Sequence, residues 1–460
     1  MTAVPCTDVS GMARAVDAAG GTASAPDGTR RHWLVDHWRR RRWALLAMVA
    51  FVAVSLAFTF LWGPVVRHKA EWVIPGDIWS TFRNAHFVGW GDIGGIYDPA
   101  YGLLTFPAVV LALTPAAMVA GHFGLTESIG LWTVPHPSAW LVLGPVVLAL
   151  GGSCLLAFDA MAEALGVDGG KRVVLLGVES VITFQVVTLW GHPEDMVALG
   201  LAGYALLMGT SGRWRPSGWL WGAAIAFQPL VLVLVPVAVV TVPRGRRVRL
   251  AVRAVLPTAV LLAIPLATQW SMTTGSLLHQ SNRTDLDHAT PWIVLSAHLG
   301  PHAVSAGPGR LIAVTAALVL GWVAWRSRPS LLGLVWLGAL ALGLRCFFES
   351  VMVPFYLGPP FALIVLAAAA GVGWRRLVGS SVAMGVATVV SFHRLGEWPY
   401  WLVLVTGLAA GLACAWPGRD AFTPGAGAAS AVRSTHPAPL AESVPPSEQS
   451  AGTTLAGTRT

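Results

Sequence analysis

Apolar runs of about 15 to 25 residues recur along the chain between residues 43 and 416, and most charged residues gather between these runs. A run of this length crosses, or nearly crosses, a hydrocarbon core of roughly 30 Å when it is helical. A helix also satisfies its own backbone hydrogen bonds, which water cannot do inside a bilayer. The pattern therefore predicts an all-α integral membrane protein, a polytopic helical bundle of about 11–13 membrane segments.

Two apolar runs contain interruptions that predict broken or re-entrant helices. Run 102–121 holds Pro107 and Pro115, and the absence of Lys and Arg from the loop after it favours a re-entrant pair over a single crossing. Run 217–242 breaks at Gln228 and has arginines at both flanks, so it should enter and leave on one side as two half-helices. The other expected segments include 43–66, 173–190, 196–208, 254–270, 311–325, 331–344, 351–371, 378–392 and 401–416.

The polar stretches divide the chain into three parts. Residues 1–38 and 417–460 are rich in small and polar residues without apolar periodicity, and we expect both to be disordered cytoplasmic segments. Residues 39–416 form the expected membrane domain, which has two long extracytoplasmic loops at 67–101 and 271–309. Because no small-residue cleavage site follows the first apolar run, that run is predicted to be a retained span and not a signal peptide.

Composition supports a multi-pass cell-membrane protein and narrows its partners. The chain is 55% hydrophobic and 11% charged, whereas soluble domains carry about 25% charged residues. Despite a formal charge of +8, the arginines lie in short clusters beside the apolar runs. Such clusters set topology and contact anionic head groups, so membrane lipids are expected partners and nucleic acid is not. The four cysteines form no C-x-x-C pair, which supports neither a disulfide framework nor a metal site.

The first loop holds the main candidate for catalysis, Asp77. It follows Pro75 and Gly76 and precedes apolar residues at helical spacing. It therefore stands at the N-cap of a short amphipathic helix, which we expect to lie in the membrane interface with tryptophan anchors. A carboxylate at this depth can act as a general base on a hydroxyl, and a simple capping role is equally open. Asp92, in a Gly-rich stretch, is expected to be a turn residue.

Two groups of polar residues are candidates for substrate binding at the same side of the membrane. Arg83 and His86 follow Asp77 on the expected helix, where they either bind a phosphate or reach into lipid head groups. His192, Glu194 and Asp195 form a polar turn between two helices. The two carboxylates complement the dipole of the second helix, and a second role is to bind sugar hydroxyls.

The later candidates are Gln228 at the helix break, Arg345 and Tyr356. Arg345 and Glu349 are four residues apart, so the simplest expectation is that they pair on one helix face. Ionisable groups at the ends of membrane spans are nonetheless functional candidates, and Arg345 is the candidate for a lipid phosphate. The chain has no G-x-S-x-G, P-loop, H-E-x-x-H or dinucleotide fingerprint in a suitable setting. No nucleotide, other cofactor or metal is therefore expected.

Several motifs together resemble a known family. They are the aspartate soon after the first span, the D-I-W-S-T-F-R-N-A-H run from Asp77, the following G-D-I-G-G-I-Y-D-P, and Phe106-Pro107 at the next apolar segment. On these motifs the chain is similar to the GT-C polytopic membrane glycosyltransferases, most closely to glycosyltransferase family 87, whose members use polyprenol-phosphate-mannose. The turn at Gly191 resembles that family's Gly-Gln-x-Asn step, and Pro354-Phe355-Tyr356 resembles its late P-x-Y motif.

The resemblance implies a GT-C-like fold and the transfer of a sugar, typically mannose, from a polyprenyl-phosphate donor. The acceptor would be a lipid-linked or cell-envelope glycan at the extracytoplasmic face. Asp77 would then be the general base of an inverting reaction, and Arg345, Arg83 or a loop histidine would stabilise the phosphate. Two positions depart from the family pattern: His192 stands where Gln is usual, and Gln228 where Lys is often found.

Two other classes of function stay open at this point. Broken helices also suit a transporter or flippase for a lipid-linked or small solute, and a scaffold in envelope assembly is the third reading. A transporter needs polar residues at the bilayer midplane, whereas most of those in this chain are expected in loops at interface depth. That difference favours the enzyme.

Overall fold

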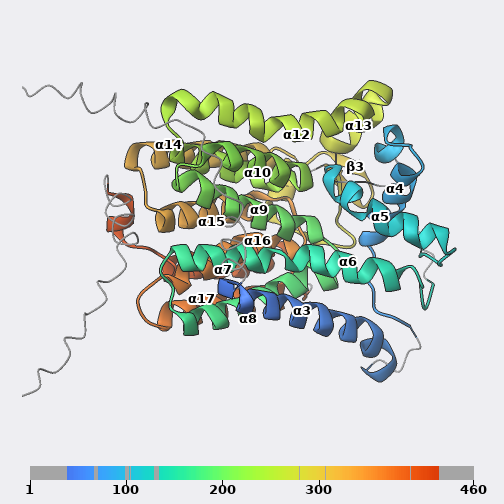
Figure 1. The fold of residues 1–460 in the computed structure, drawn as a ribbon, viewed down its shortest axis with the longest axis horizontal. Helices are drawn as coiled ribbons and strands as arrows, with labels where there is room; N and C mark the ends of the chain where they lie inside the picture. Colours follow the sequence, from blue (N-terminus) through green and yellow to red (C-terminus); the bar gives the residue numbers. More distant parts are fainter. Residues whose placement is uncertain are drawn as a thin grey trace, which may run out of the picture.

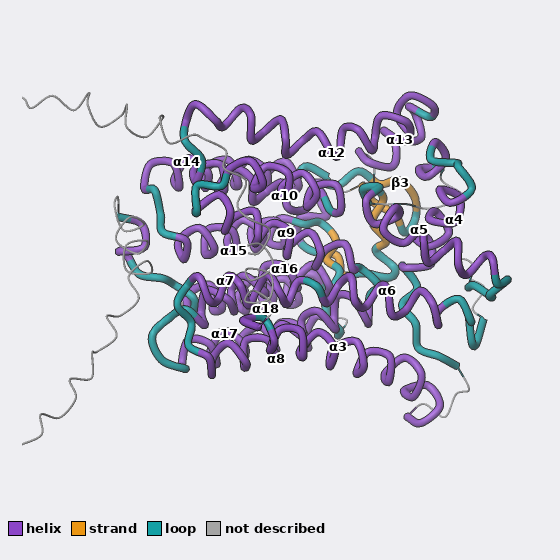
Figure 2. The backbone as a smooth tube through the Cα atoms, in the orientation of Figure 1, coloured by secondary structure: helices purple, strands orange, loops and turns teal. Residues whose placement is uncertain are grey.

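The computed structural model of the protein describes residues 39–66, 71–98, 103, 105–128, 134–278, 280–305, 307–393 and 395–423. The segments expected to be disordered, 1–38 and most of 417–460, lie outside this part of the chain. Long helices run side by side along one axis, and the few short strands gather near one end (Figures 1 and 2). The described residues thus form an all-α bundle with a small amount of sheet.

Seven described segments are long and apolar enough to cross a membrane: Arg42–Val65, Trp140–Ala164, Gly169–Leu189, Arg244–Thr268, Gly309–Ser327, Leu331–Phe348 and Glu397–Cys414. These correspond to α3 (Arg42–Leu61) with the π-helical η1 (Trp62–Val66), α6 (Trp140–Gly152) with α7 (Cys154–Ala164), α8 (Gly169–Thr183) with η3 (Phe184–Leu189), η6 (Arg244–Arg246) with α12 (Arg247–Thr268), α14 (Gly309–Ser327), α15 (Leu331–Phe348) and α18 (Glu397–Cys414). They indicate a multi-pass membrane protein.

Other helices lie beside these segments. They are α9 (Pro193–Thr210), α10 (Trp214–Phe227), η4 (Pro229–Leu234), α11 (Val235–Ala238), η5 (Val239–Thr241), α16 (Gly358–Ala369) and α17 (Arg375–Ser391). Every residue of α16 is buried, and the helix lies in the middle of the bundle beside α8 and α15 (Figure 1). A helix that is apolar on all sides belongs in such a position. The last described helix, η9 (Arg419–Phe422), packs Phe422 against Trp336 of α15.

The two interrupted runs behave differently. The break at Gln228 is confirmed: α10 ends there, the backbone of Gln228 is extended (φ −149°, ψ 117°), and η4 begins at Pro229. Run 102–121 was wrongly expected to be a re-entrant pair, because it contains one continuous helix, α5 (Ala108–His122). Pro107 stands before the first turn and Pro115 is accommodated inside the helix, so neither divides it.

The second long loop is not irregular throughout. After α13 (Trp270–Leu278) it forms β1 (Ser281–Arg283), β2 (His288–Ala289), η7 (Pro291–Leu295), β3 (His298–Gly300) and β4 (Ala303–Ser305). An antiparallel sheet has the order β1-β4-β3, and β2 pairs antiparallel with β5 (Val351–Met352). The run expected at 351–371 therefore begins with β5 and η8 (Pro354–Leu357), and only then becomes α16. Strands of two or three residues leave too short a pattern to recognise in the sequence.

The first loop forms α4 (Ile78–Gly89) and η2 (Gly94–Tyr97). The expected helix exists, but Trp79 is not an anchor in the membrane interface: it is buried and packs near Trp140 and Phe82. Helix α4 lies against α5, which in turn contacts α6. The aspartate expected in a turn, Asp92, does accept a hydrogen bond from the Gly95 N–H (3.0 Å).

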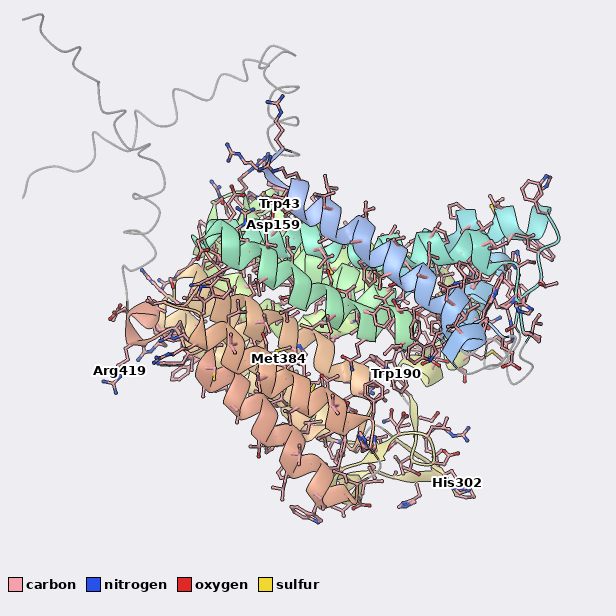
Figure 3. The ribbon with its side chains drawn as sticks, turned by 90° about the horizontal axis from the view of Figure 1, so that it is seen from below. Trp43, Asp159, Trp190, His302, Met384 and Arg419 are labelled. Atoms are coloured by element: carbon pink, nitrogen blue, oxygen red, sulfur yellow. The ribbon has the colours of Figure 1, made fainter. Side chains whose placement is uncertain are left out.

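The two ends of the bundle differ in composition. We call the end at which α3, α8, α10 and α12 begin the arginine end, and the end with α4, the strands and the start of α9 the loop end (Figure 1). Asp159 and Arg419 lie toward the arginine end, whereas Trp190 and His302 lie toward the loop end (Figure 3). The half-helices around Gln228 begin and end at the arginine end, where Thr241 of η5 lies beside Gly209 of α9.

Candidate functional site at the loop end

Asp77 and His192 meet at the loop end, although 115 positions separate them in the sequence. Asp77 stands before α4, but its side chain makes no capping hydrogen bond. Its Oδ2 instead lies 3.2 Å from Nε2 of His192, and the Nδ1 of His192 lies 2.8 Å from Oε1 of Glu194. One imidazole therefore bridges two carboxylates. The side chain of Asp77 is 60% exposed, while that of Glu194 is buried, so only the first carboxylate is open to a ligand.

Gly191 makes this meeting possible. Its backbone is left-handed (φ +83°), and a Cβ atom there would lie 3.0 Å from Cβ of Pro75 and 3.1 Å from the backbone N of Ile78. Glycine adopts this conformation without strain and leaves room for the close approach. Pro193 then starts α9, and its fixed φ suits the first helical position. The turn before α9 is thus packed directly against the turn before α4.

The charge of His192 follows from its surroundings. Burial disfavours the charged imidazolium, but the neighbouring Glu194 carboxylate and the hydrogen bonds to Asp77 and Glu194 outweigh this effect and raise the pKa of His192 to about 10. His192 is therefore an imidazolium at neutral pH and donates to both carboxylates. The imidazolium beside Asp77 fixes the direction in which that carboxylate points.

The helix break at Gln228 contributes to the same region. The side-chain amide of Gln228 donates to Oδ1 of Asp195, in the first turn of α9. Because the backbone of Gln228 is extended at the end of α10, its side chain reaches across to α9. Asp195 also attracts Arg345. The break therefore holds a buried carboxylate between the His192 turn and the arginines described next.

A continuous line of contacts leads from His192 to Arg345. The ring of His192 stacks on Phe355 with centroids 3.9 Å apart, and Phe355 contacts Tyr356. The guanidinium of Arg345 lies over the Tyr356 ring, 4.3 Å from its centroid, an arrangement that favours a cation. Arg345 also forms the expected ion pair with Glu349, at 3.6 Å between Nη2 and Oε2.

Arg310 completes this cluster and was not among the candidates from the sequence. Its Nε lies 3.4 Å from Oε1 of Glu349, and its Nη1 donates to Oε1 of Gln280 (2.9 Å). Glu349 is thus held between two arginines. A Cβ atom on Gly309 would lie 2.0 Å from the carbonyl oxygen of Phe348, so glycine permits the close approach of α14 to α15 that brings Arg310 to Glu349. The sequence contained one indication of this role: Arg310 stands at the loop end of a span, whereas the positive-inside rule places most arginines at the other end.

An apolar groove of about 510 Å³ lies between α14 and α15, the two helices that also carry Arg310 and Arg345. One wall is α14, with Leu311, Thr315 and Val319, and the other is α15, with Leu344 and Phe348. Leu311 follows Arg310 in the chain and Leu344 precedes Arg345. A hydrocarbon chain can therefore lie in the groove while an anionic group at its head contacts the arginines.

Arg83 and His86 belong to a different cluster. Nδ1 of His86 lies 2.8 Å from Oε1 of Glu127, in the loop that follows α5. Burial raises the pKa of Glu127, although His86 and Arg83 both act to lower it. The structure thus places these two candidates against Glu127 and not with the Asp77–His192 pair.

Two oxygens of the loop-end cluster lack hydrogen bonds to the described residues. They are the buried Oε2 of Glu194 and Oε2 of Glu349. Buried polar atoms are normally paired, so each such atom needs an explanation. Among the described residues, no group of three or more His, Cys, Asp or Glu side chains is arranged to hold a metal ion.

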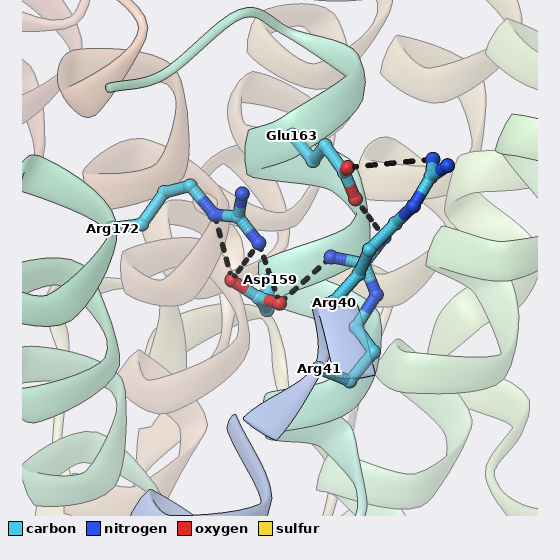
Figure 4. Close-up of polar contacts among 5 residues, drawn as sticks. All are labelled: Arg40, Arg41, Asp159, Glu163 and Arg172. Carbon is cyan, nitrogen blue, oxygen red and sulfur yellow. Dashed lines mark hydrogen bonds and ion pairs between the residues drawn. The ribbon is translucent and has the colours of Figure 1, made fainter. Parts of the chain in front are cut away.

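A second buried ion network lies at the arginine end (Figure 4). Asp159 accepts from Nη1 of Arg41 (2.7 Å) and from Nε and Nη2 of Arg172 (both 2.8 Å). Arg41 also donates to Glu163, and Arg40 lies 4.0 Å from the same carboxylate. Asp159 and Glu163 were not recognised as partners in the sequence, because they lie inside an otherwise apolar stretch. This network fastens α3 to α7 and α8.

No protein-family model matches the chain, and no curated protein is similar to it in sequence. The function is therefore inferred from the motifs and the geometry of this chain.

Proposed function

We propose that this chain is a membrane glycosyltransferase. It would move a sugar, mannose by the resemblance in its motifs, from a polyprenyl-phosphate donor to a lipid-linked or cell-envelope glycan acceptor at the loop end. The observation that carries the proposal is an exposed carboxylate, Asp77, held by His192 in a line of contacts that ends at two arginines, which stand on the two helices that line an apolar groove. A donor with a long hydrocarbon tail, one phosphate and one sugar needs these three features together.

The reaction assigns each feature a role. Asp77 accepts the proton of the acceptor hydroxyl while that oxygen bonds to the anomeric carbon from the face opposite the phosphate. The bond between the anomeric carbon and the phosphate oxygen breaks, and its electron pair leaves with the phosphate. The polyprenyl phosphate gains one negative charge, which Arg345 and Arg310 stabilise. Configuration at the anomeric carbon inverts, and the chemistry uses only the donor, the acceptor and these side chains.

The central experiment is sugar transfer in liposomes, with purified protein, radiolabelled polyprenyl-phosphate mannose and an extract of envelope lipids as acceptors. Asp77→Asn should lower the transfer rate by about 10²- to 10⁴-fold, the usual contribution of a general base. Asp92→Asn is the matched control, since this aspartate lies in the same loop and only caps a turn. Full transfer by Asp77→Asn would remove the base assignment, and loss of transfer in both variants would point to a loop that no longer folds.

A transporter or flippase is the second candidate, and one observation favours it. Glu179 lies in the middle of the α8–η3 segment, is fully buried, and neither side-chain oxygen has a hydrogen-bond partner among the described residues. Ionisable groups inside a membrane often mark a transport pathway. If the wild-type protein transfers no sugar but moves a fluorescent lipid phosphate across the bilayer, and Glu179→Gln stops that movement, transport replaces the enzyme proposal.

A further inference from the structure

The arginine end carries a second charged surface, which the proposed reaction does not use. Seven arginines lie between residues 213 and 253, at the starts of α10 and α12, whereas the chain has no Asp or Glu from Met196 to Thr284. The ion pairs of the described residues at this end involve Arg40, Arg41, Lys171 and Arg172, and none of them includes the seven. No described carboxylate therefore neutralises this surface.

Three of these arginines gather around one tryptophan. The guanidinium carbons of Arg215, Arg246 and Arg253 lie 5.6, 5.4 and 4.6 Å from the centre of the Trp214 ring. Trp214 is 6% exposed and packs against Val242 and Leu250. We call Trp214 and these three arginines the Trp214 cluster. The buried ring holds the three cations in one place, whereas arginines on an open surface move freely.

Close packing of two helices brings the cluster together. A Cβ atom on Gly222 of α10 would lie 2.5 Å from the carbonyl oxygen of Arg253 in α12. The two helices also touch at Gly218, where a Cβ would lie 3.0 Å from Cβ of Arg253. Because α10 and α12 both start at this end, their N-terminal N–H groups add to the positive potential of the arginines. The positive charge of three guanidinium groups and two helix N-termini is more than a ligand with one negative charge can neutralise.

We infer that the Trp214 cluster binds the head group of a lipid with two phosphates, at the membrane face opposite Asp77. Two phosphates fit the surplus of positive charge better than one, and the planar arginine fork binds phosphate oxygens two at a time. The apolar side chains of α12 that face outward beside the cluster, such as Val248 and Val252, would lie along the acyl chains. Basic pockets between membrane helices recognise lipids of this kind.

The test is lipid binding to the full-length protein in detergent, measured by native mass spectrometry. Cardiolipin is the probe with two phosphates, phosphatidylglycerol has one, and phosphatidylcholine is zwitterionic. We expect one cardiolipin to bind more tightly than either of the others. Arg246→Gln combined with Arg253→Gln should weaken cardiolipin binding by about 30-fold, from the usual effect of two arginines at a membrane surface.

Two further double variants test whether binding depends on this site or only on the total positive charge. Arg326→Gln with Arg328→Gln removes the same charge elsewhere on the arginine end and should leave cardiolipin binding unchanged. Arg246→Lys with Arg253→Lys keeps the charge but loses the planar forks, and should give intermediate affinity. Equal binding of cardiolipin and phosphatidylglycerol, or equal losses in the 246/253 and 326/328 glutamine variants, would overturn the inference. No sugar transfer is measured, so this result is independent of the reaction proposed at the loop end.

Discussion

The two buried ion networks of this protein have similar components but differ in how far their carboxylates are exposed. At the arginine end, both oxygens of Asp159 accept from arginines, and the carboxylate is 1% exposed. At the loop end, Glu194 and Glu349 are buried as deeply, yet each keeps an oxygen without a hydrogen bond, and Asp77 beside them is largely exposed. The loop-end network therefore includes one carboxylate that a ligand can reach, Asp77, whereas Asp159 at the arginine end is enclosed by its arginine partners.

Among the substitutions that test this difference, Asp159→Ala should have the largest effect. The substitution leaves Arg41 buried without its main partner, so we expect the free energy of unfolding to fall by about 3–5 kcal/mol. Chemical unfolding in detergent micelles measures this change. Asp77→Asn, at an exposed carboxylate, should change the same quantity by less than about 0.5 kcal/mol. Equal stability of Asp159→Ala and the wild type would show that the arginine-end network does not hold the helices together.

The next effect is a pH dependence at the loop end. The pKa of His192 is raised from 6.5 to about 10 in the folded protein, so its stabilisation is complete below pH 6.5 and is lost as the pH rises toward 10. The unfolding free energy of the wild type should fall over this window, by at most about 1.4 kcal/mol per pH unit. His192→Gln should remove this part of the slope. Parallel curves for the two proteins would contradict the assigned charge of His192.

The smallest expected effect on stability is at Arg40, at the exposed edge of the arginine-end network. Arg40 lies 4.0 Å from Glu163 and is 69% exposed, so Arg40→Ala should cost less than about 1 kcal/mol. Compared with Asp159→Ala in the same unfolding assay, it separates the buried part of the network from the exposed part. A loss as large as that of Asp159→Ala would mean that the network is not organised around Asp159.

The sequence predicted those features that depend on local patterns. The apolar runs located the bundle, the Gln228 break appears where the arginines at both flanks required it, and the Arg345–Glu349 pair follows from helical spacing. The pattern located the apolar side of α4 but not what covers it, so this side was expected in the membrane interface, whereas Trp79 on it lies in the protein core. What covers the apolar side of a helix depends on neighbours that are distant in the chain.

Contacts between distant parts of the chain also limited the prediction of the candidate site. Asp77, His192, Glu194, Asp195, Gln228, Arg345 and Tyr356 were all selected from the sequence, and the structure brings them into one continuous region. Arg83 and His86, selected for their closeness to Asp77 in the chain, face Glu127 instead. Arg310 was missed because its partner Glu349 is 39 residues away. Closeness in the sequence was therefore a weaker indicator of the site than contact between turns that are distant in the chain.

The burial of α16 has a consequence for how the protein is made. This helix lies at the centre of the bundle, yet the ribosome synthesises it after α3 to α15. The helices inserted earlier can therefore enclose their centre only after residue 369 has left the ribosome. Phe355 and Tyr356 are synthesised just ahead of α16, so the aromatic contacts that connect His192 to Arg345 cannot form much earlier. The centre of the core and the candidate site therefore both depend on this late segment of the chain.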